Sequence, residues 1–208
     1  MASKFSRWFC LNWFRSESRI RVDAAESLFS FLNLGRHDQP VGLYSPPDLN
    51  AARDRFGANC GPAALAAVIR ASIISVMPFF PDFPARTWTT AGDMRTALDR
   101  ARVDYHETGN CSPEYGVALI QFGTAGMHPI AALKLTHWVA ICGSFIYDNN
   151  WDGWLPMPIW EQVIFSEFQH RNPKIESWRV RCGMGFAGGC PAANYFPEQS
   201  RFPAGRPT

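Results

Sequence analysis

The feature that most constrains this fold is a change of hydrophobic periodicity near the middle of the chain. Before it, apolar residues recur at helical spacing, most clearly over 60–76, where Pro62 fits only a first turn and the helix therefore begins at about Cys60. After it come short runs rich in β-branched and aromatic residues, which are typical of strands. Helices followed by strands predict an α+β fold with an antiparallel sheet.

The same reading gives each expected element and its limits. Helices are predicted over 22–34, 60–76, 90–102 and 160–169, and strands over 118–122, 129–135, 137–143, 145–149 and 176–182. Prolines indicate loops over 36–58 and 77–89, and Gly and Pro dominate from Gly183 onward. We therefore expect a basic aromatic helical head over 1–35, one α+β domain over 36–182, and a Gly/Pro-rich tail over 183–208.

Composition argues against several classes of protein. The chain has 20 Lys and Arg against 18 Asp and Glu, and this net charge of +2 argues against a nucleic-acid-binding protein. No stretch approaches the ~18 consecutive apolar residues of a transmembrane helix. The cysteines form no CxxC pair, so a zinc ribbon is not expected. Because the N-terminus lacks the apolar core of a secretory signal, we expect reduced cysteines and a cytoplasmic protein, with export by a non-classical route left open.

The head is expected to pack against a surface, because its aromatic side chains are costly to expose. Five of them lie in the first fourteen residues: Phe5, Trp8, Phe9, Trp13 and Phe14. The covering surface is either the domain itself or a partner, which includes a second copy of the chain. A membrane surface is the alternative.

Cys60 is the strongest candidate for a nucleophile. It stands at the start of the predicted helix, where backbone N–H groups and the helix dipole stabilise a thiolate. The neighbouring Gly61 permits close approach of another chain segment. The alternative is an ordinary buried cysteine at a helix start.

A predicted β-hairpin supplies a base and a group to orient it. His137 begins the first strand, and Asp148 lies near the end of the second. If residues 143–144 form a two-residue loop, the register places Asp148 on the face of His137. A three-residue loop would bring Asn149 to that face instead.

The order of these three residues resembles the papain-like cysteine peptidases, and most closely their compact C39-like branch. The matching segments are CGPAAL at 60–65, HWV at 137–139 and IYD at 146–148. The resemblance covers about residues 50–165. It implies a papain-like core within 36–182, in which a helical half carries the nucleophile and an antiparallel sheet carries His and Asp.

One position departs from the papain-like pattern. The family has a Gln about six residues before the nucleophile, and its amide stabilises the oxyanion; here that position is Asp54. The replacement donor is expected to be Asn59, with Asn50 and Gln39 as alternatives, helped by the backbone N–H of Cys60. Losing one oxyanion donor typically costs about 10²–10³ in rate.

The resemblance implies a thiol-dependent hydrolase that cleaves a peptide or isopeptide bond through a Cys60–His137–Asp148 triad and a thioester, with no metal or organic cofactor. A transpeptidase would resolve the same thioester with an amine. One alternative is a catalytically weak or inactive binding or assembly module. Another is an ovarian-tumour-like deubiquitinase, although that family has Asp where this sequence has Gly57.

The remaining candidate residues have weaker signals. Trp151 and Trp154 follow Asp148 closely, and either could shield the His–Asp hydrogen bond from water. The other groups are expected to be structural, solvated or in plain loops: Cys182 with Cys190, His106 with Cys111, His128 and His170.

Overall fold

A computed structural model describes residues 42–57, 59–80, 82–83, 85–86, 88–123, 135–151, 153–171, 173 and 175–189. The predicted head, Gln39, His128, Cys190 and nearly all of the predicted strand 129–135 lie outside the described residues. The described part is a mixture of helices and an antiparallel sheet, so the predicted α+β class is confirmed.

The sheet has six strands in the order β1-β6-β2-β3-β4-β5, and every neighbouring pair is antiparallel. Their bounds are β1 Tyr105–Gly109, β2 Tyr115–Gly123, β3 Thr136–Cys142, β4 Phe145–Asp148, β5 Gly153–Pro156 and β6 Ser177–Phe186. The two-residue loop predicted between β3 and β4 is confirmed, because Cys142 pairs with Phe145.

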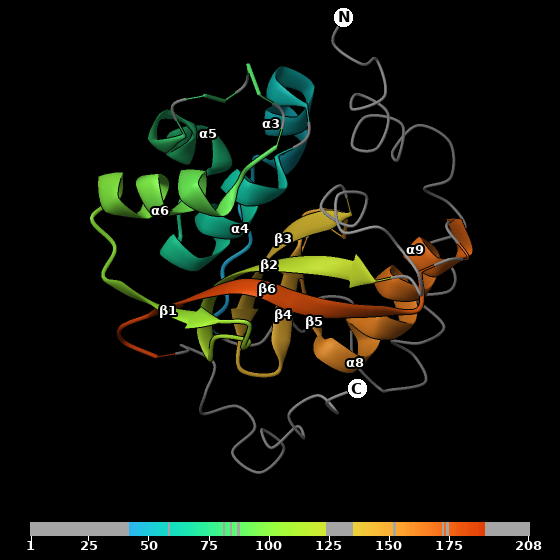
Figure 1. Ribbon diagram of the computed structural model, residues 1–208. Helices are drawn as coiled ribbons and strands as arrows, with labels where there is room; N and C mark the ends of the chain where they lie inside the picture. Colours follow the sequence, from blue (N-terminus) through green and yellow to red (C-terminus); the bar gives the residue numbers. More distant parts are fainter. Residues whose placement is uncertain are drawn as a thin grey trace, which may run out of the picture.

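Helices cover both faces of this sheet (Figure 1). One group comprises α3 Leu49–Phe56, α4 Cys60–Ile69, α5 Ile73–Val76, the 3₁₀ turn η1 Met77–Phe79 and α6 Ala91–Arg100. The other is a continuous run of α8 Met157–Trp160, the π-helical turn η2 Glu161–Phe165 and α9 Ser166–Arg171. The predicted helices 90–102 and 160–169 are thus present, the second extended at both ends.

The alternating side chains of the central strands build two separate cores. On β3, Trp138 and Ala140 pack with the helices α3 to α6, whereas Val139 and Ile141 pack with the helices α8 to α9. This alternation follows from the two-residue repeat of a strand. The sheet is therefore covered on both faces, and its central strands read as nearly continuous apolar runs.

The prediction of one helix over 60–76 is wrong. Helix α4 ends at Ile69, and Arg70, its C-cap, adopts a left-handed conformation with φ of 59°. Ser72 then caps α5, and the Asp48 carboxylate accepts the backbone N–H groups of the first two residues of α5 at 2.8 Å each. A distant acid and a non-glycine left-handed residue produce this break, and neither gives a local sequence signal.

Two regions predicted as loop or tail hold regular structure. Helix α3 lies within 36–58; it is strongly polar and buries only Leu49 and Ala52, so its apolar pattern is weak. Strand β6 continues to Phe186, so the tail does not begin at Gly183. A Cβ on Gly183 would lie 2.2 Å from the Thr108 side chain, so this glycine permits the close approach of β1. The edge strands β1 and β5 also escaped prediction, because β1 carries little apolar pattern and β5 has only four residues.

The cysteines differ in state. Cys142 is in a disulfide. Cys60, Cys111 and Cys182 are free thiols. The expectation that all cysteines are reduced is therefore wrong for Cys142. Cys142 is fully buried at the end of β3, and no local motif in the sequence marks it.

Within the described residues, no single helix has the length and apolar character needed to cross a membrane. Helix α4 together with the segment Ile73–Phe79 meets that criterion by length and composition only as a pair, and the pair is bent by 103°.

Replacing Gly116 of β2 should strongly destabilise the sheet. A Cβ at Gly116 would lie 1.9 Å from the carbonyl oxygen of Met184 on β6. Gly116→Ala should lower the free energy of unfolding by about 2 kcal/mol or more, measured by urea denaturation. Gly92→Ala is the matched control, because its Cβ would meet nothing closer than 3.6 Å inside helix α6. Equal effects of both changes would contradict this account.

Candidate active site

Cys60 is the first residue of α4, and its side chain is half-buried against the core on that face of the sheet. The sequence predicted this helix start correctly. The alanines that follow Cys60 in α4 are buried in the same core as Trp138 and Ala140 of β3, and this packing holds the helix against the strand. The thiol therefore stands at the N-terminus of a helix held by packing, where the helix dipole favours a negative charge.

His137 lies near the start of β3, and Asp148 ends β4. The His137 Nε2 atom lies 3.0 Å from Asp148 Oδ1, and both side chains are buried, with Asp148 wholly inaccessible to solvent. The predicted choice of Asp148 over Asn149 as the partner of His137 therefore matches the geometry. It follows from the two-residue hairpin loop.

The His137 ring also forms a hydrogen bond with the thiol of Cys60. Because Nε2 is engaged by Asp148, the other ring nitrogen, Nδ1, is the one left for the sulfur. The backbone N–H of Trp138 donates a second hydrogen bond to the same sulfur. Sulfur, imidazole and carboxylate thus form one connected chain.

Charge and burial shift the pKa values of Cys60 and His137 in opposite directions. Burial raises the pKa of Cys60, but the hydrogen bond and positive charge of His137 outweigh it and lower that pKa below its ordinary value. Burial lowers the pKa of His137, yet the charge and hydrogen bond of Asp148, together with Cys60, raise it to about 10. The arrangement therefore favours a thiolate beside an imidazolium at neutral pH.

Asp148 is stabilised as an anion by three donors. Besides His137, the backbone N–H of Asn150 donates to Oδ1 at 2.8 Å, and the indole Nε1 of Trp160 donates to Oδ2 at 2.8 Å. Burial raises the pKa of Asp148, but the charge of His137 and these hydrogen bonds lower it below its ordinary value. Each carboxylate oxygen is thereby engaged, as a buried charge requires.

Trp160 is the site residue that sequence reasoning missed. Of the two tryptophans expected as shields, Trp154 belongs to the core on the opposite face from Trp160 and donates its indole N–H to the Tyr44 carbonyl, whereas Trp151 packs against the core that contains Trp160. Trp160 reaches Asp148 because α8 crosses the face of the sheet that carries it. No local motif in the sequence marks this contact.

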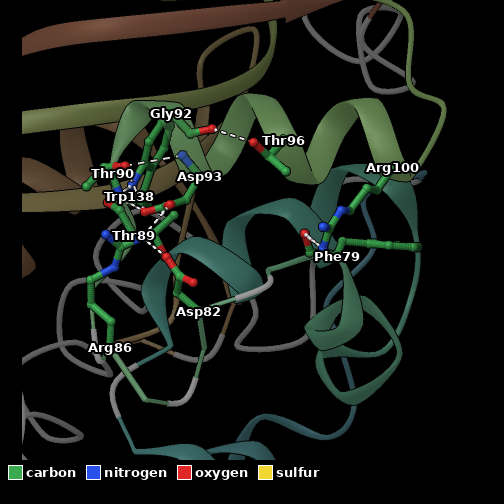
Figure 2. Close-up of polar contacts among 10 residues, drawn as sticks. All are labelled: Phe79, Asp82, Arg86, Thr89, Thr90, Gly92, Asp93, Thr96, Arg100 and Trp138. Atoms are coloured by element: carbon green, nitrogen blue, oxygen red, sulfur yellow. Dashed lines mark hydrogen bonds and ion pairs between the residues drawn. The ribbon is translucent and has the colours of Figure 1, made fainter.

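The segment before α6 forms a wall against the start of α4. The indole N–H of Trp138 donates to the Thr89 carbonyl at 2.8 Å, and Arg86 bridges to Asp93 in the first turn of α6 (Figure 2). A Cβ on Gly61 would lie 2.3 Å from the Thr89 hydroxyl oxygen, so the wall touches the residue that follows Cys60. The predicted role of Gly61 in permitting close approach matches this contact.

The candidate oxyanion donors lie in different surroundings. Asn59 directly precedes Cys60, and its side chain is almost completely buried. Its Oδ1 accepts a hydrogen bond from Asn149 Nδ2 at 3.1 Å, and among the described residues its Nδ2 has no hydrogen-bond partner. Asn50 is exposed on α3 and accepts from Arg53, and Asp54 is also exposed there.

The weaker candidates do not join the site. In the described part of the chain, no group of three or more His, Cys, Asp or Glu side chains is placed to hold a metal ion. The His106 ring packs over Gly185, and His170 and Cys111 are exposed. Cys182 is a half-buried free thiol.

Comparison with known proteins gives no relative. No protein-family model, no curated protein and no solved structure matches this chain.

Trp160 should stabilise the fold through the charged form of Asp148. Trp160→Phe removes the donor to Oδ2, and the free energy of unfolding at pH 7 should fall by about 2 kcal/mol, as for a hydrogen bond to a charged group. A carboxyl group whose pKa is lower in the folded than in the unfolded state stabilises the fold at pH values above its unfolded-state pKa. This contribution is lost as the pH falls through its folded-state pKa. The difference in the free energy of unfolding between wild type and Trp160→Phe should therefore decrease below about pH 4, where carboxyl groups become protonated.

The control for this measurement is Trp178→Phe. The indole of Trp178 packs edge-on against Trp160 but donates to Glu161 at the surface. Because Glu161 is exposed to solvent, Trp178→Phe should lower the free energy of unfolding by less, and this loss should change less between neutral and acid pH. Urea denaturation across pH values measures both, and parallel curves for the two variants would contradict the role given to Trp160.

Proposed function

We propose that this protein is a thiol-dependent hydrolase that cleaves a peptide or isopeptide bond through Cys60, His137 and Asp148. The observation that supports it most strongly is the connected chain of hydrogen bonds from the Cys60 sulfur through His137 to a fully buried Asp148. A structural cysteine needs neither a buried imidazole nor a buried carboxylate behind it. Burying an imidazole and a carboxylate costs free energy, and such a cost is typical of sites that need a reactive thiolate.

In the first half-reaction, the Cys60 thiolate attacks the carbonyl carbon and forms a C–S bond, while the carbonyl electron pair moves onto oxygen. As that pair returns, the C–N bond breaks and His137 donates its proton to the departing amine. The product is a thioester on Cys60. Asp148 keeps the imidazole oriented and stabilises its positive charge.

In the second half-reaction, water attacks the thioester carbon and gives a proton to the now neutral His137. The C–S bond then breaks, which releases a carboxylic acid and restores the thiolate–imidazolium pair. An amine in place of water would give a transpeptidase by the same steps. No group beyond the chain's own residues is required for the proton transfers.

The resemblance to papain-like peptidases supports the same proposal. A nucleophile helix packed on an antiparallel sheet, with His and Asp on two neighbouring strands, is the arrangement that the resemblance implies. The substrate class stays open among peptides, isopeptides, ubiquitin-like tails and peptidoglycan stems.

Cys60 should alkylate unusually fast below pH 8. The pKa of Cys60 lies below its ordinary value, so much of it is thiolate where an unperturbed thiol, with a pKa near 8.5, is protonated. Iodoacetamide labelling followed by peptide mass spectrometry measures the rate, with the exposed free Cys111 as an internal comparison. In His137→Ala, the thiol loses the imidazole, while burial and the negative charge of Asp148 still raise its pKa, so the rate profile should move to higher pH than that of the wild type.

Hydrolysis itself is tested with a defined mixture of synthetic peptides and isopeptides, by detecting new termini and a thioester on Cys60. Cys60→Ala should abolish both signals, and Asp148→Asn should reduce turnover by about 10²-fold or more, the scale of losing the orienting member of a triad. Slow alkylation of Cys60 with no dependence on His137 would contradict the hydrolase. It would favour an inactive binding or assembly module.

A further inference from the structure

Two buried asparagines, each next in sequence to a residue of the candidate triad, are hydrogen-bonded to each other. Asn59 directly precedes Cys60, and Asn149 directly follows Asp148; their side chains are 1% and 6% exposed. Asn149 Nδ2 donates to Asn59 Oδ1 at 3.1 Å. The pair therefore joins the start of the nucleophile helix to the end of β4.

This pair leaves one donor and one acceptor unused. Asn59 Nδ2 and Asn149 Oδ1 are both buried, and neither has a hydrogen-bond partner within the described residues. Buried polar groups in proteins are normally paired, and leaving one unpaired costs free energy. A buried N–H next to a nucleophile is the kind of group that a substrate oxygen would satisfy.

The direction of the hydrogen bond decides which end of the Asn59 carboxamide is unused. A carboxamide has nearly the same shape after a half-turn about its last bond, but the turn exchanges a donor for an acceptor. Asn149 offers an N–H, so it retains the oxygen of Asn59 and leaves the nitrogen available. Arg53 donates to the backbone carbonyl of Asn149 at 3.0 Å and so holds that residue in place.

We propose that Asn149 is a positioning residue that orients the Asn59 carboxamide, so that Asn59 presents an N–H to the oxyanion formed during acyl transfer. Asn59 then supplies the donor that papain-like enzymes obtain from the Gln replaced here by Asp54. This inference rests on the function proposed above. Its distinct content is that Asn149 acts only through Asn59.

Two small probes separate this role from the reactivity of the thiol. p-Nitrophenyl acetate acetylates a cysteine: the sulfur bonds to the carbonyl carbon, a negative charge forms on the carbonyl oxygen, and p-nitrophenolate leaves with the electron pair. Iodoacetamide is attacked at a saturated carbon and iodide leaves, so no oxyanion forms. The ratio of the two rate constants, each at its high-pH plateau, reports stabilisation of the oxyanion.

The central variant is Asn149→Asp, which keeps the shape but replaces a donor with an acceptor. The ionised carboxylate attracts the Asn59 N–H, so the carboxamide turns its oxygen toward the oxyanion. Acetylation should fall about 10- to 100-fold, toward the cost of losing an oxyanion donor, while the iodoacetamide plateau changes less than about threefold. Asn149→Ala should cost less than Asn149→Asp, because it leaves Asn59 free to turn either way.

The pH profile adds a signature that a purely structural role would not give. The deficit of Asn149→Asp should shrink as pH falls, because a protonated carboxyl has an O–H to donate to Asn59. Asn59→Asp is the second variant, and it should show the same selective loss without disturbing the donor on Asn149. Asn110→Asp, at an exposed turn after β1, introduces the same charge and should leave both rates unchanged.

Each outcome decides the matter. A larger selective loss for Asn149→Asp than for Asn149→Ala supports the proposal. Equal loss in both probes, or no loss in either, overturns it and leaves the hydrolase proposal intact. If wild-type Cys60 reacts with iodoacetamide but not with the ester, the acyl-transfer function fails, and the role of Asn149 fails with it.

Discussion

The fold depends on how it accommodates one ionised carboxyl group at zero exposure. Asp148 cannot be charged inside this sheet unless donors and a positive charge surround it, and the structure supplies three hydrogen bonds from three different segments of the chain. The imidazolium of His137 balances its charge, and the sulfur of Cys60 lies beyond it. Helix α8, the turn after β4 and the start of β3 must therefore all be correctly placed before this group is stable.

The cores on the two faces of the sheet supply different parts of this arrangement. Trp160 and the apolar residues around it cover the carboxylate, and Phe168 of α9 lies 6.3 Å from the His137 ring, centroid to centroid. The opposite core holds helix α4 and its thiol against β3. Trp138 connects them, because its backbone N–H reaches the sulfur while its indole reaches Thr89.

Short-range sequence signals were enough to predict part of the fold and of the candidate site. Pro62 fixed the start of α4, and the short loop between β3 and β4 fixed which of two adjacent residues faces His137. What could not be predicted depends on contacts between distant positions. Asn59 and Asn149 are 90 positions apart, and the acid that caps α5 lies 25 positions before it. A single sequence gives no periodicity or motif for such pairs, and Trp160 has the same difficulty, because only the crossing of α8 brings it to Asp148.

The proposed triad draws its groups from both faces of the sheet, and this has a consequence for folding. The thiol belongs to one layer, and the group that shields the carboxylate belongs to the other, so neither layer holds a complete reactive centre. A nascent or partly unfolded chain that has docked only one layer carries an ordinary cysteine. In the proposed hydrolase, the thiol therefore becomes reactive only after the helices on both faces of the sheet have docked.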